Sequence, residues 1–411
     1  MNDINVFQAI LGTTEPWAVR AVEVDTTKEV IRIEMEVRQD RPWACPICHR
    51  AMHVHDWSRR KWRHLDTQQF QTWIEAEVPT VRCSEHGSQI VQVPWAEPYA
   101  RFTMLFERMA IALLQAMSME QVRKRLSISW DEADGIKARA VARGQLRRQA
   151  VVMKHLRVDE KHAGQNLWLT LVSCVDGGKA RVVYIAQGKD QTALDPFWKA
   201  MTPEQLTGID SIAMDMSNAF TNSVLMHVPN GKLKLVYDRF HVAQHMNHAV
   251  DEVRRQEQAV MAHDAAKHVK GTRFWWLYRP DHLPEQLRRR FRAVKRIAKR
   301  TAQAWELKEL LRTFWDCPDE PTGRHHLREW LRRALRTGLE PVRKVARMCR
   351  DHIENLLTYF AHRATNASAE AVNSRIQSLI AKACGYRNPL RLITDIWFHL
   401  GDLDLEPRFV Q

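Results

Sequence analysis

The spacing of apolar positions changes along the chain, and each change predicts a different kind of structure. Between residues 20 and 98, short alternating stretches such as Val78–Cys83 and Ile90–Val93 predict strands in a segment rich in Trp and His. From Met104 to Gly144 the apolar residues recur at helical spacing. The first third of the chain is therefore expected to hold a small β module followed by helices.

Strand and helix patterns alternate in the middle of the chain, which is typical of an α/β unit. The predicted strands cover residues 155–158, 167–174, 181–186, 211–214 and 233–237. Helices are predicted at residues 192–201 and 219–227, and Asp176-Gly177-Gly178 is a strong signal for a hairpin turn.

The strand signal ends near Arg239. Basic amphipathic helices dominate from there to about Arg363, and the stretch Ala367–Lys382 is again helical. The overall pattern predicts a mixed α/β, multi-domain protein.

The charge balance points to nucleic acid. The chain has 62 Lys and Arg against 48 Asp and Glu, a formal net charge of +14, and such a surplus suits a surface that neutralises phosphates. Basic residues crowd positions 288–300, where Arg288, Arg289 and Arg292 are candidates for DNA contacts. The alternative is a merely basic soluble protein.

The sequence also predicts where the protein resides. No apolar run is long enough to cross a bilayer, and the first nine residues lack the features of a secretory signal. We therefore expect a cytoplasmic, nucleoid-associated protein.

Three of the seven cysteines are spaced like metal ligands. Cys45 and Cys48 form one close pair, and Cys83 and His86 form another, so the four can surround one structural Zn²⁺ ion. The segment looks too poor in apolar residues to hold together without the ion. Other histidines nearby leave the fourth ligand open, namely His49, His53, His55 and His64.

The helical stretch after this module carries two N-terminal capping boxes. Ser118 with Gln121 and Ser129 with Glu132 would begin two successive helices joined by a tight turn. This arrangement predicts a DNA-binding helix-turn-helix, although a plain helical hairpin has the same pattern. The candidate DNA contacts are Arg139, Arg143, Arg147 and Arg148.

Aspartates follow three of the predicted strands. Asp159, Asp215 and Asp238 each come directly after an apolar stretch, and carboxylates at the ends of adjacent strands can hold two Mg²⁺ ions roughly 3.5–4 Å apart. Aspartates are also common turn formers at strand ends, so the pattern alone leaves both interpretations open.

Four stretches in this order resemble the ISL-three family of insertion-sequence transposases. They are Trp62–Asp66, Val236–Val242, Ala304–Glu309 and Thr365–Ile376, and Gly385–Asn388 fits as well. The resemblance implies a zinc module at residues 1–100, a helix-turn-helix at 101–150, and a ribonuclease H-like catalytic core in two parts, 151–250 and 363–411, separated by an all-helical insertion at 251–362.

The resemblance also implies a catalytic triad. The carboxylates of the family map to Asp159, Asp215 and Glu370, which would hold two Mg²⁺ (or Mn²⁺) ions. Asp238 and His241 would support the site, or cap the next helix, and Asp238 remains an alternative to Asp215.

Two tryptophans of the insertion allow two interpretations. Trp275 and Trp276 can stack on a flipped base or a strand end, or they can pack in the helical core, which we favour.

The function implied is that of a DNA transposase. It would bind the terminal inverted repeats of a mobile element, cut there, and join the released 3′ end to target DNA. Pairing of two ends implies a homodimer, by analogy with such enzymes. The main alternative is a non-catalytic DNA-binding regulator derived from a transposase. A zinc hydrolase is disfavoured because four protein ligands leave zinc no open position.

Overall fold

The computed structural model describes the backbone of residues 3–13, 15–37, 42–164, 167–176, 178–279, 282–362 and 367–408, and their side chains except at positions 3 and 367–370. The chain divides into two compact units, one formed by residues 1–149 with 394–411 and the other by residues 150–393. None of the described helices is both long and apolar enough to cross a membrane.

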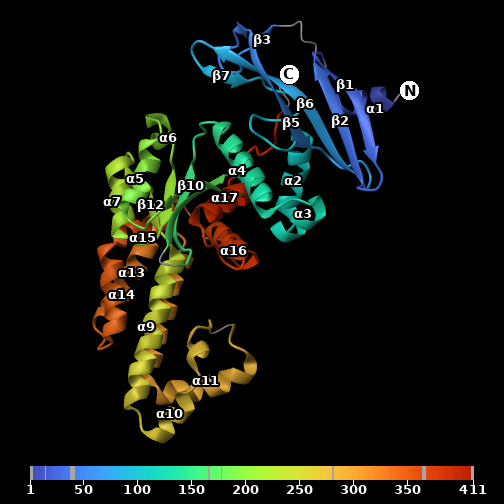
Figure 1. The fold of residues 1–411 in the computed structure, drawn as a ribbon. Coiled ribbons are helices and arrows are strands. Elements are labelled where there is room, and N and C mark those ends of the chain that lie inside the picture. The colour runs from blue at the N-terminus through green and yellow to red at the C-terminus, as the bar shows by residue number, and fades with distance from the viewer. Residues whose placement is uncertain are drawn as a thin grey trace. The chain divides into compact units, whose positions relative to one another are not determined.

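The first unit begins with a five-stranded sheet (Figure 1). Its central path runs in the order β1 (Trp17–Asp25), β2 (Val30–Val37), β6 (Gln71–Cys83) and β5 (Val54–Arg63), and β7 (Gly87–Ile90) pairs with β6. Helix α1 (Asp3–Leu11) precedes the sheet, and a small hairpin joins β3 (Trp43–Ala44) to β4 (Ala51–Met52). The predicted strand at 90–93 is therefore displaced, because the structure has it at 87–90.

A tryptophan-rich core holds this sheet together. The alternation in β2 buries Ile31, Ile33 and Met35 on one face, and the ring of Trp95 lies 4.9 Å from Trp17 and 5.5 Å from Trp62, centroid to centroid. The expectation that this segment lacks an apolar core is therefore wrong. The residues that build the core are spread over several strands, and only part of them were recognised in the sequence.

Three helices follow the sheet: α2 (Met104–Ala116), α3 (Met119–Leu126) and α4 (Trp130–Leu146). Both predicted capping boxes are present, at Ser118 before α3 and Ser129 before α4. Ser127 between them adopts a left-handed conformation, with φ 53°, and so closes a tight turn. The helix-turn-helix geometry follows from these local signals.

The end of the chain belongs to this unit. Phe398 in α17 (Pro389–Leu400) and Leu405 join the core formed by α2, α3 and α4. Lys137 of α4 forms a buried ion pair with Asp395. The assignment of residues 363–411 as a whole to the catalytic core is therefore corrected for residues 394–411.

The second unit is built on a mixed five-stranded sheet. Its strand order is β10 (Lys179–Gln187), β9 (Trp168–Asp176), β8 (His155–His162), β11 (Ser211–Met214) and β12 (Leu235–Tyr237). Strands β10, β9 and β8 pair antiparallel, whereas β8, β11 and β12 pair parallel. The register pairs Asp176 with Lys179, as the predicted hairpin requires, and Gly177 lies outside the described residues.

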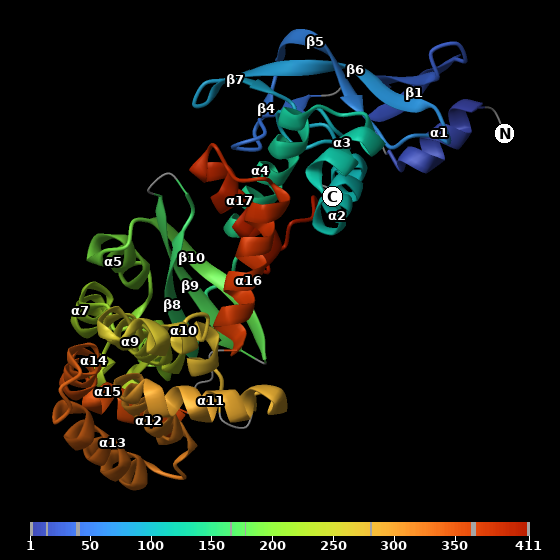
Figure 2. The same ribbon diagram turned by 90° about the horizontal axis from the view of Figure 1, so that it is seen from below.

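Helices cover both faces of this sheet (Figure 2). Helices α5 (Gln191–Lys199) and α7 (Asn218–His227) lie on one face, and α16 (Ala367–Lys382) lies on the other. Two short helices, α6 (Pro203–Thr207) and α8 (Gly231–Lys234), complete the connections. The predicted strand at 233–237 is shorter in the structure, because residues 231–234 form α8.

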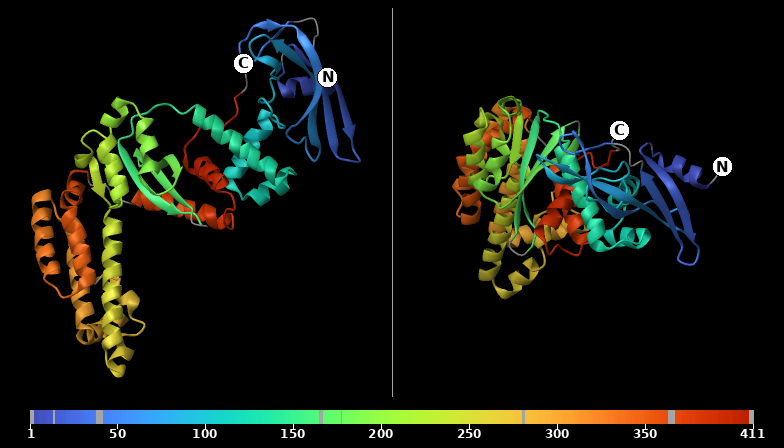
Figure 3. Two further views of the ribbon diagram at one scale, coloured as in Figure 1. Left: turned by 60° about the vertical axis from the view of Figure 1, so that its left-hand side comes forward. Right: turned by 45° about the horizontal axis from the view of Figure 1, so that its top comes forward.

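The insertion between β12 and α16 consists of helices joined by short loops and has no strand among its described residues, as predicted. It begins with the long helix α9 (Arg239–Val260), which runs out from the sheet (Figure 3). The remaining elements are α10 (His263–Val269), the 3₁₀ helix η1 (Arg273–Trp276), α11 (Glu285–Ile297), α12 (Lys299–Arg312), the 3₁₀ helix η3 (Thr313–Asp316), α13 (Glu320–Leu335), α14 (Glu340–Asp351) and α15 (Ile353–His362).

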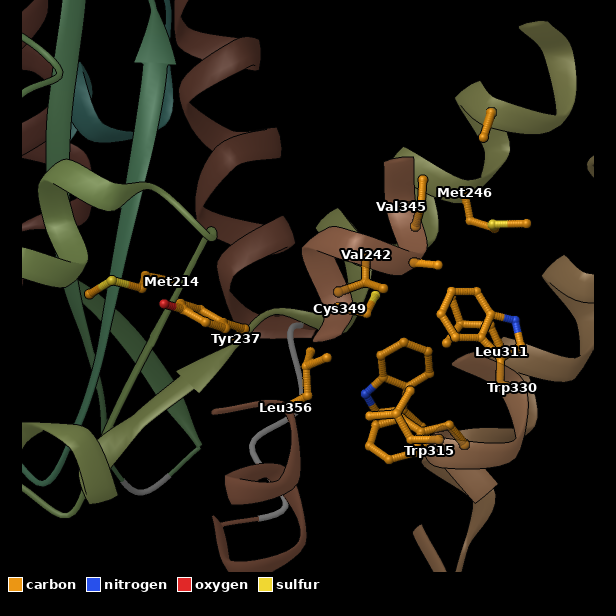
Figure 4. Packing of buried hydrophobic residues seen from close by; sticks show 14 of the residues in the cluster. Met214, Tyr237, Val242, Met246, Leu311, Trp315, Trp330, Val345, Cys349 and Leu356 are labelled. Atoms are coloured by element: carbon orange, nitrogen blue, oxygen red, sulfur yellow. The ribbon is translucent and has the colours of Figure 1, made fainter. Parts of the chain in front are cut away.

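The insertion and the sheet share one hydrophobic core. Met214 and Tyr237 at the strand ends pack in the same cluster as Val242 of α9 and Trp330 of α13 (Figure 4). Because this core is continuous, α9 has a fixed start at the sheet.

Helix α15 also covers the edge of the sheet. Its side chains donate hydrogen bonds to backbone carbonyls beside β12, from Thr358 Oγ1 to Leu235 O at 2.7 Å and from Asn355 Nδ2 to Lys232 O at 3.0 Å. The first bond occupies an acceptor that the edge strand β12 would otherwise expose, and the second reaches the preceding helix α8.

Candidate functional site

Three cysteines and one histidine meet in the first unit. The ligand atoms of Cys45, Cys48, Cys83 and His86 all lie within 4.8 Å of one another. The sulfurs of Cys48 and Cys83 are 3.8 Å apart, and Nδ1 of His86 lies 3.5 Å from the Cys83 sulfur. Ligands at about 2.3 Å from a tetrahedral zinc ion would lie roughly 3.8 Å apart, so this set has the chemistry and spacing of a structural zinc site.

Two tight turns bring these ligands together. The backbone N–H of His49 donates to Cys45 O at 2.9 Å, which closes the first turn, and Gly87, with φ 69°, ends the second. The backbone N–H of Cys48 lowers the pKa of the Cys45 thiol, and backbone N–H groups of Glu85 and His86 lower the pKa of Cys83. Such donors favour the thiolate form that binds metal.

His64, another candidate for the fourth ligand, has a different role. Its Nδ1 lies 2.9 Å from Thr103 Oγ1, and burial lowers the pKa of His64 to about 4. It therefore links the sheet to the start of α2 as a neutral side chain.

The predicted aspartates of the second unit lie in one row. Ala213 of β11 pairs with Arg157 of β8 on one side and Val236 of β12 on the other. Two residues further along each parallel strand come Asp159, Asp215 and Asp238. The three aspartates are therefore at the same level on the same face of adjacent strands. Asp215 and Asp238 directly follow β11 and β12, whereas Asp159 lies inside β8, because that strand continues beyond the predicted end at residue 158. We call them the carboxylate row.

Each aspartate of the row has one oxygen held by the backbone. Asp159 Oδ1 accepts from the N–H of Glu160 at 2.7 Å, and Asp215 Oδ1 accepts from the N–H of Met216 at 2.5 Å. Asp238 Oδ1 accepts from the N–H of Phe240 at 2.8 Å, which caps α9. These bonds fix the three carboxylates, so that Oδ2 of each is the oxygen left for other partners.

The Oδ2 atoms of the three aspartates lie near other side chains of the site. His241 lies between two aspartates, with Nδ1 3.9 Å from Asp215 Oδ2 and Nε2 3.7 Å from Asp238 Oδ2. Asn373 of α16 donates a hydrogen bond from Nδ2 to Asp159 Oδ2. The contact between Asn373 and Asp159 joins segments 214 residues apart.

A fourth carboxylate, Glu160, lies beside the row. Burial raises the pKa of Glu160, and the negative charge of Asp215 raises it further, whereas Lys189 lowers it. Glu160 was not singled out in the sequence, although it directly follows Asp159. The raised pKa of Glu160 therefore reflects burial first and the neighbouring aspartates second.

Glu370 belongs to α16, and its side chain lies outside the described residues. Its position is one helical turn before Asn373. Asn373 lies in the stretch Thr365–Ile376 that resembles the family, and no local pattern in the sequence marks it as a partner of Asp159.

The arginines predicted to bind DNA, on and just after α4, mainly form ion pairs and hydrogen bonds within the first unit. Arg143 is only 7% exposed and donates to Leu405 O at 2.7 Å and to Glu97 Oε2 at 2.8 Å. Arg139 pairs with the buried Glu107, and Arg147 donates to Glu406 O at 2.6 Å. The DNA-binding assignment of Arg143 is therefore corrected, because its guanidinium is buried and already bonded.

Arg148 differs from these residues. It is exposed, with its guanidinium 5.6 Å from the ring of Trp397. Its contact with DNA stays a prediction.

The arginines of α11 are exposed. Among the described residues, neither Arg289 nor Arg292 has an acidic partner, whereas Arg288 pairs with Glu285 at 2.9 Å. Trp276 is buried, with 1% of its surface exposed, and packs 4.8 Å from Phe291 between ring centroids. A ring so buried has no free face for a base, so Trp276 is a packing residue, which agrees with the favoured interpretation and excludes the stacking role for this ring.

Comparisons with known proteins agree with this arrangement. Residues 156–396 match the transposase family ISL3. Residues 41–86 match the zinc finger of the transposases IS204, IS1001, IS1096 and IS1165, and residues 91–141 match the helix-turn-helix domain of transposase family ISL3.

Two relatives extend the similarity along the chain. The transposase for insertion sequence element IS1557 of Mycobacterium tuberculosis is 25% identical, over 96% of this chain and 94% of its own length. The transposase for insertion sequence element IS1001 of Bordetella parapertussis is 21% identical, over 82% of this chain and 84% of its own length.

Three features agree with these matches: a zinc-type cluster, a helix-turn-helix and a row of carboxylates on adjacent strands. Together they define the class of protein as a transposase with DNA-binding modules. The family match covers more than half of the residues, and the chain belongs to the ISL3 family of transposases.

Proposed function

We propose that this transposase cuts DNA at the terminal inverted repeats of an insertion sequence and joins the released 3′ ends to target DNA, using Asp159, Asp215 and Glu370 with two Mg²⁺ (or Mn²⁺) ions. The observation that carries the proposal is the carboxylate row, in which three aspartates lie in register on adjacent parallel strands.

The residues of the row fit Mg²⁺. Neighbouring strands lie about 4.8 Å apart, so carboxylates at one level on adjacent strands can share ions roughly 3.5–4 Å apart. All donors are hard oxygens, which Mg²⁺ prefers. Asp159 and Asp215 are half-buried rather than enclosed, so a DNA phosphate can approach them.

The position of α16 supports Glu370 as the third ligand. Asn373 of this helix contacts Asp159, and position 370 is one turn earlier, where residues three apart share a helix face. The strand order, three antiparallel strands followed by two parallel ones, supports a ribonuclease H-like core. The helical insertion lies between Asp215 and Glu370, as the family resemblance implies.

Two bound ions would activate the attacking oxygen and stabilise the leaving oxygen of the phosphodiester. In this proposal Asp215 and Asp159 would hold the ions through their carboxylate oxygens. His241 lies between Asp215 and Asp238, with ring nitrogens 3.9 Å and 3.7 Å from their Oδ2 atoms. The first attack, by water, releases a 3′-hydroxyl, and the second, by that hydroxyl, breaks one target phosphodiester as it forms another, so no external energy source is needed.

DNA recognition is assigned to both units. The zinc module and the helix-turn-helix would bind the inverted repeats, and the exposed arginines of α11 would hold phosphates near the site. Because two ends must be joined together, we propose a homodimer on paired ends.

The test is cleavage of a labelled DNA fragment that carries the element end, with Mg²⁺ or with EDTA. Asp215→Ala and Glu370→Ala should abolish cleavage but still bind the end at matched salt. Asp264→Ala is the control, because Asp264 is an exposed carboxylate on α10, away from the row. If the wild type binds the end but never cuts, the regulator interpretation replaces the proposal.

A further inference from the structure

The insertion exposes a cluster of large apolar side chains in one short segment. Phe274 is 64% exposed, Tyr278 42% and Leu277 38%. Soluble proteins expose single apolar residues routinely, but several adjacent ones indicate a contact surface. We call residues 273–279 the aromatic segment.

Buried contacts hold the aromatic segment in place. The ring of Trp276 is buried against Phe291, its Nε1 donates to Thr272 Oγ1 at 3.3 Å, and Lys308 Nζ donates to Trp276 O at 2.8 Å. Trp276 therefore anchors the segment, and Phe274 and Tyr278 face outward from a fixed backbone.

Positive charge surrounds these exposed rings. The Arg273 guanidinium lies 5.8 Å from the centre of the Phe274 ring, and Arg279 is exposed at the other end of the segment. Helix α11, against which Trp276 packs, adds exposed arginines on one flank, at positions 289, 292 and 296. No described carboxylate pairs with Arg279 or with these three arginines, so the surface suits an anionic partner.

We propose that the aromatic segment binds unpaired nucleotides of the DNA strand that passes through the carboxylate row, with Phe274 stacking on a base. This inference rests on the proposed function and adds the kind of DNA that the insertion recognises. In duplex DNA both faces of each base are covered by its neighbours. An exposed ring therefore gains stacking energy only from an unpaired base, whereas arginines bind paired and unpaired strands alike.

The length of α9 gives the distance between the carboxylate row and the aromatic segment. Asp238 caps the start of α9, and Arg273 of the aromatic segment pairs with Asp251 of the same helix at 3.5 Å. Thirteen residues at 1.5 Å rise per residue place this contact roughly 20 Å along the helix. A strand with about 3.4 Å per nucleotide spans that distance in about six nucleotides.

The experiment compares two labelled fragments that carry the element end, one fully paired and one with six nucleotides next to the cleavage position left unpaired. Binding of the full chain is measured by fluorescence anisotropy at one salt concentration, in EDTA so that no cleavage occurs. The wild type should prefer the unpaired fragment. Phe274→Ala should reduce that preference by roughly 5- to 100-fold, as expected from the loss of one stacked base, and should leave duplex binding unchanged.

Two further variants make the result specific. Phe274→Leu keeps an apolar side chain but removes the flat ring, and should lose the preference as Phe274→Ala does. Leu225→Ala removes another exposed apolar side chain, on α7, and should change nothing. The inference is overturned if Phe274→Ala keeps the full preference, or if its main effect is to abolish self-association, because a second copy would then cover the segment. If the wild type binds neither fragment, the proposed function fails instead.

Discussion

The zinc-type cluster and the carboxylate row collect their ligands in opposite ways. The cluster takes four soft or borderline ligands from two tight turns, and the four ligand atoms lie within 4.8 Å of one another. The row takes hard oxygens from three adjacent strands, and each aspartate has one oxygen fixed by the backbone and one facing a side chain.

The two sets of ligands suit two different kinds of metal site, a closed structural site in the cluster and an open site in the row. Four protein ligands fill the coordination of a zinc ion and leave no position for a substrate. Asp159 and Asp215 of the row are only half-buried, and ions held there would keep positions for phosphate. In the proposed function the first unit therefore contributes zinc-stabilised DNA binding, and the second unit carries the chemistry together with its own contacts to DNA.

The largest effect is expected in the row. Asp159→Asn should slow single-turnover cleavage of the element end by about 10³-fold or more, because an amide cannot replace a charged ligand that supplies several kcal/mol to the transition state. The zinc content of the same sample, measured by atomic emission, should stay that of the wild type. If zinc is lost together with cleavage, the two sites are not independent and the comparison fails.

The next effect is expected at the cluster. Cys83→Ser should weaken zinc binding by more than roughly 100-fold and should remove specific binding to the element end. The near-ultraviolet circular dichroism of the tryptophan core around Trp95 should persist, because that core is formed by apolar side chains and none of the four ligands belongs to it. Cys384→Ser is the matched control, since Cys384 is exposed and outside the cluster. Collapse of the tryptophan signal in Cys83→Ser would show that the sheet needs the ion after all.

A smaller effect tests how the row is oriented. Asn373→Ala removes the donor that holds Asp159 Oδ2 and should raise the Mg²⁺ concentration for half-maximal cleavage about 10- to 100-fold. Calorimetric titration of the free protein with Mn²⁺ should show the same loss. Gln377→Ala, an exposed change one turn further along α16, should leave both values unchanged. If Asn373→Ala and Gln377→Ala bind metal equally well, Asn373 does not orient Asp159 and only packs against it.

The smallest effect on cleavage is expected at Asp238, and it tests whether this residue caps α9 or acts as a catalytic carboxylate. Asp238→Asn keeps a good helix cap and should lower cleavage by about tenfold at most. Asp238→Ala removes the cap of α9 and should lower the free energy of unfolding by about 1 kcal/mol in a denaturant titration. A loss of cleavage in Asp238→Asn as large as that in Asp215→Asn would make Asp238 the second catalytic carboxylate.

Local signals predicted much of the second unit. The strand at 211–214 and the aspartates that follow the strands were read from apolar runs that end in a carboxylate. The contact of Asn373 with Asp159 was not predictable in this way, because it joins distant segments and depends on how α16 packs on the sheet.

The arginines show a second limit of sequence reasoning. Arg143 and Arg292 both lie in basic helices and were both assigned to DNA. Arg143 is buried because Glu107 and the carbonyl of Leu405 lie opposite it, and these partners come from other parts of the chain. Arg292 meets no such partner among the described residues and remains exposed.

The N-terminal sheet was under-predicted for a different reason. The alternation of Val30–Val37 is a clear strand pattern that was not used, and it supplies Ile31, Ile33 and Met35 to the core. The parallel pairing of this strand with β6 joins distant parts of the chain, so the alternation of apolar residues could not predict it.

The most direct measurement is a crystal structure of the transposase with its element end and Mn²⁺, using anomalous scattering to locate the ions. The account predicts two peaks roughly 3.5–4 Å apart, bound by Asp159, Asp215 and Glu370, with the scissile phosphate between them. Peaks bound by Asp238 in place of Asp215, or no peak at the carboxylate row while DNA is bound, would contradict it.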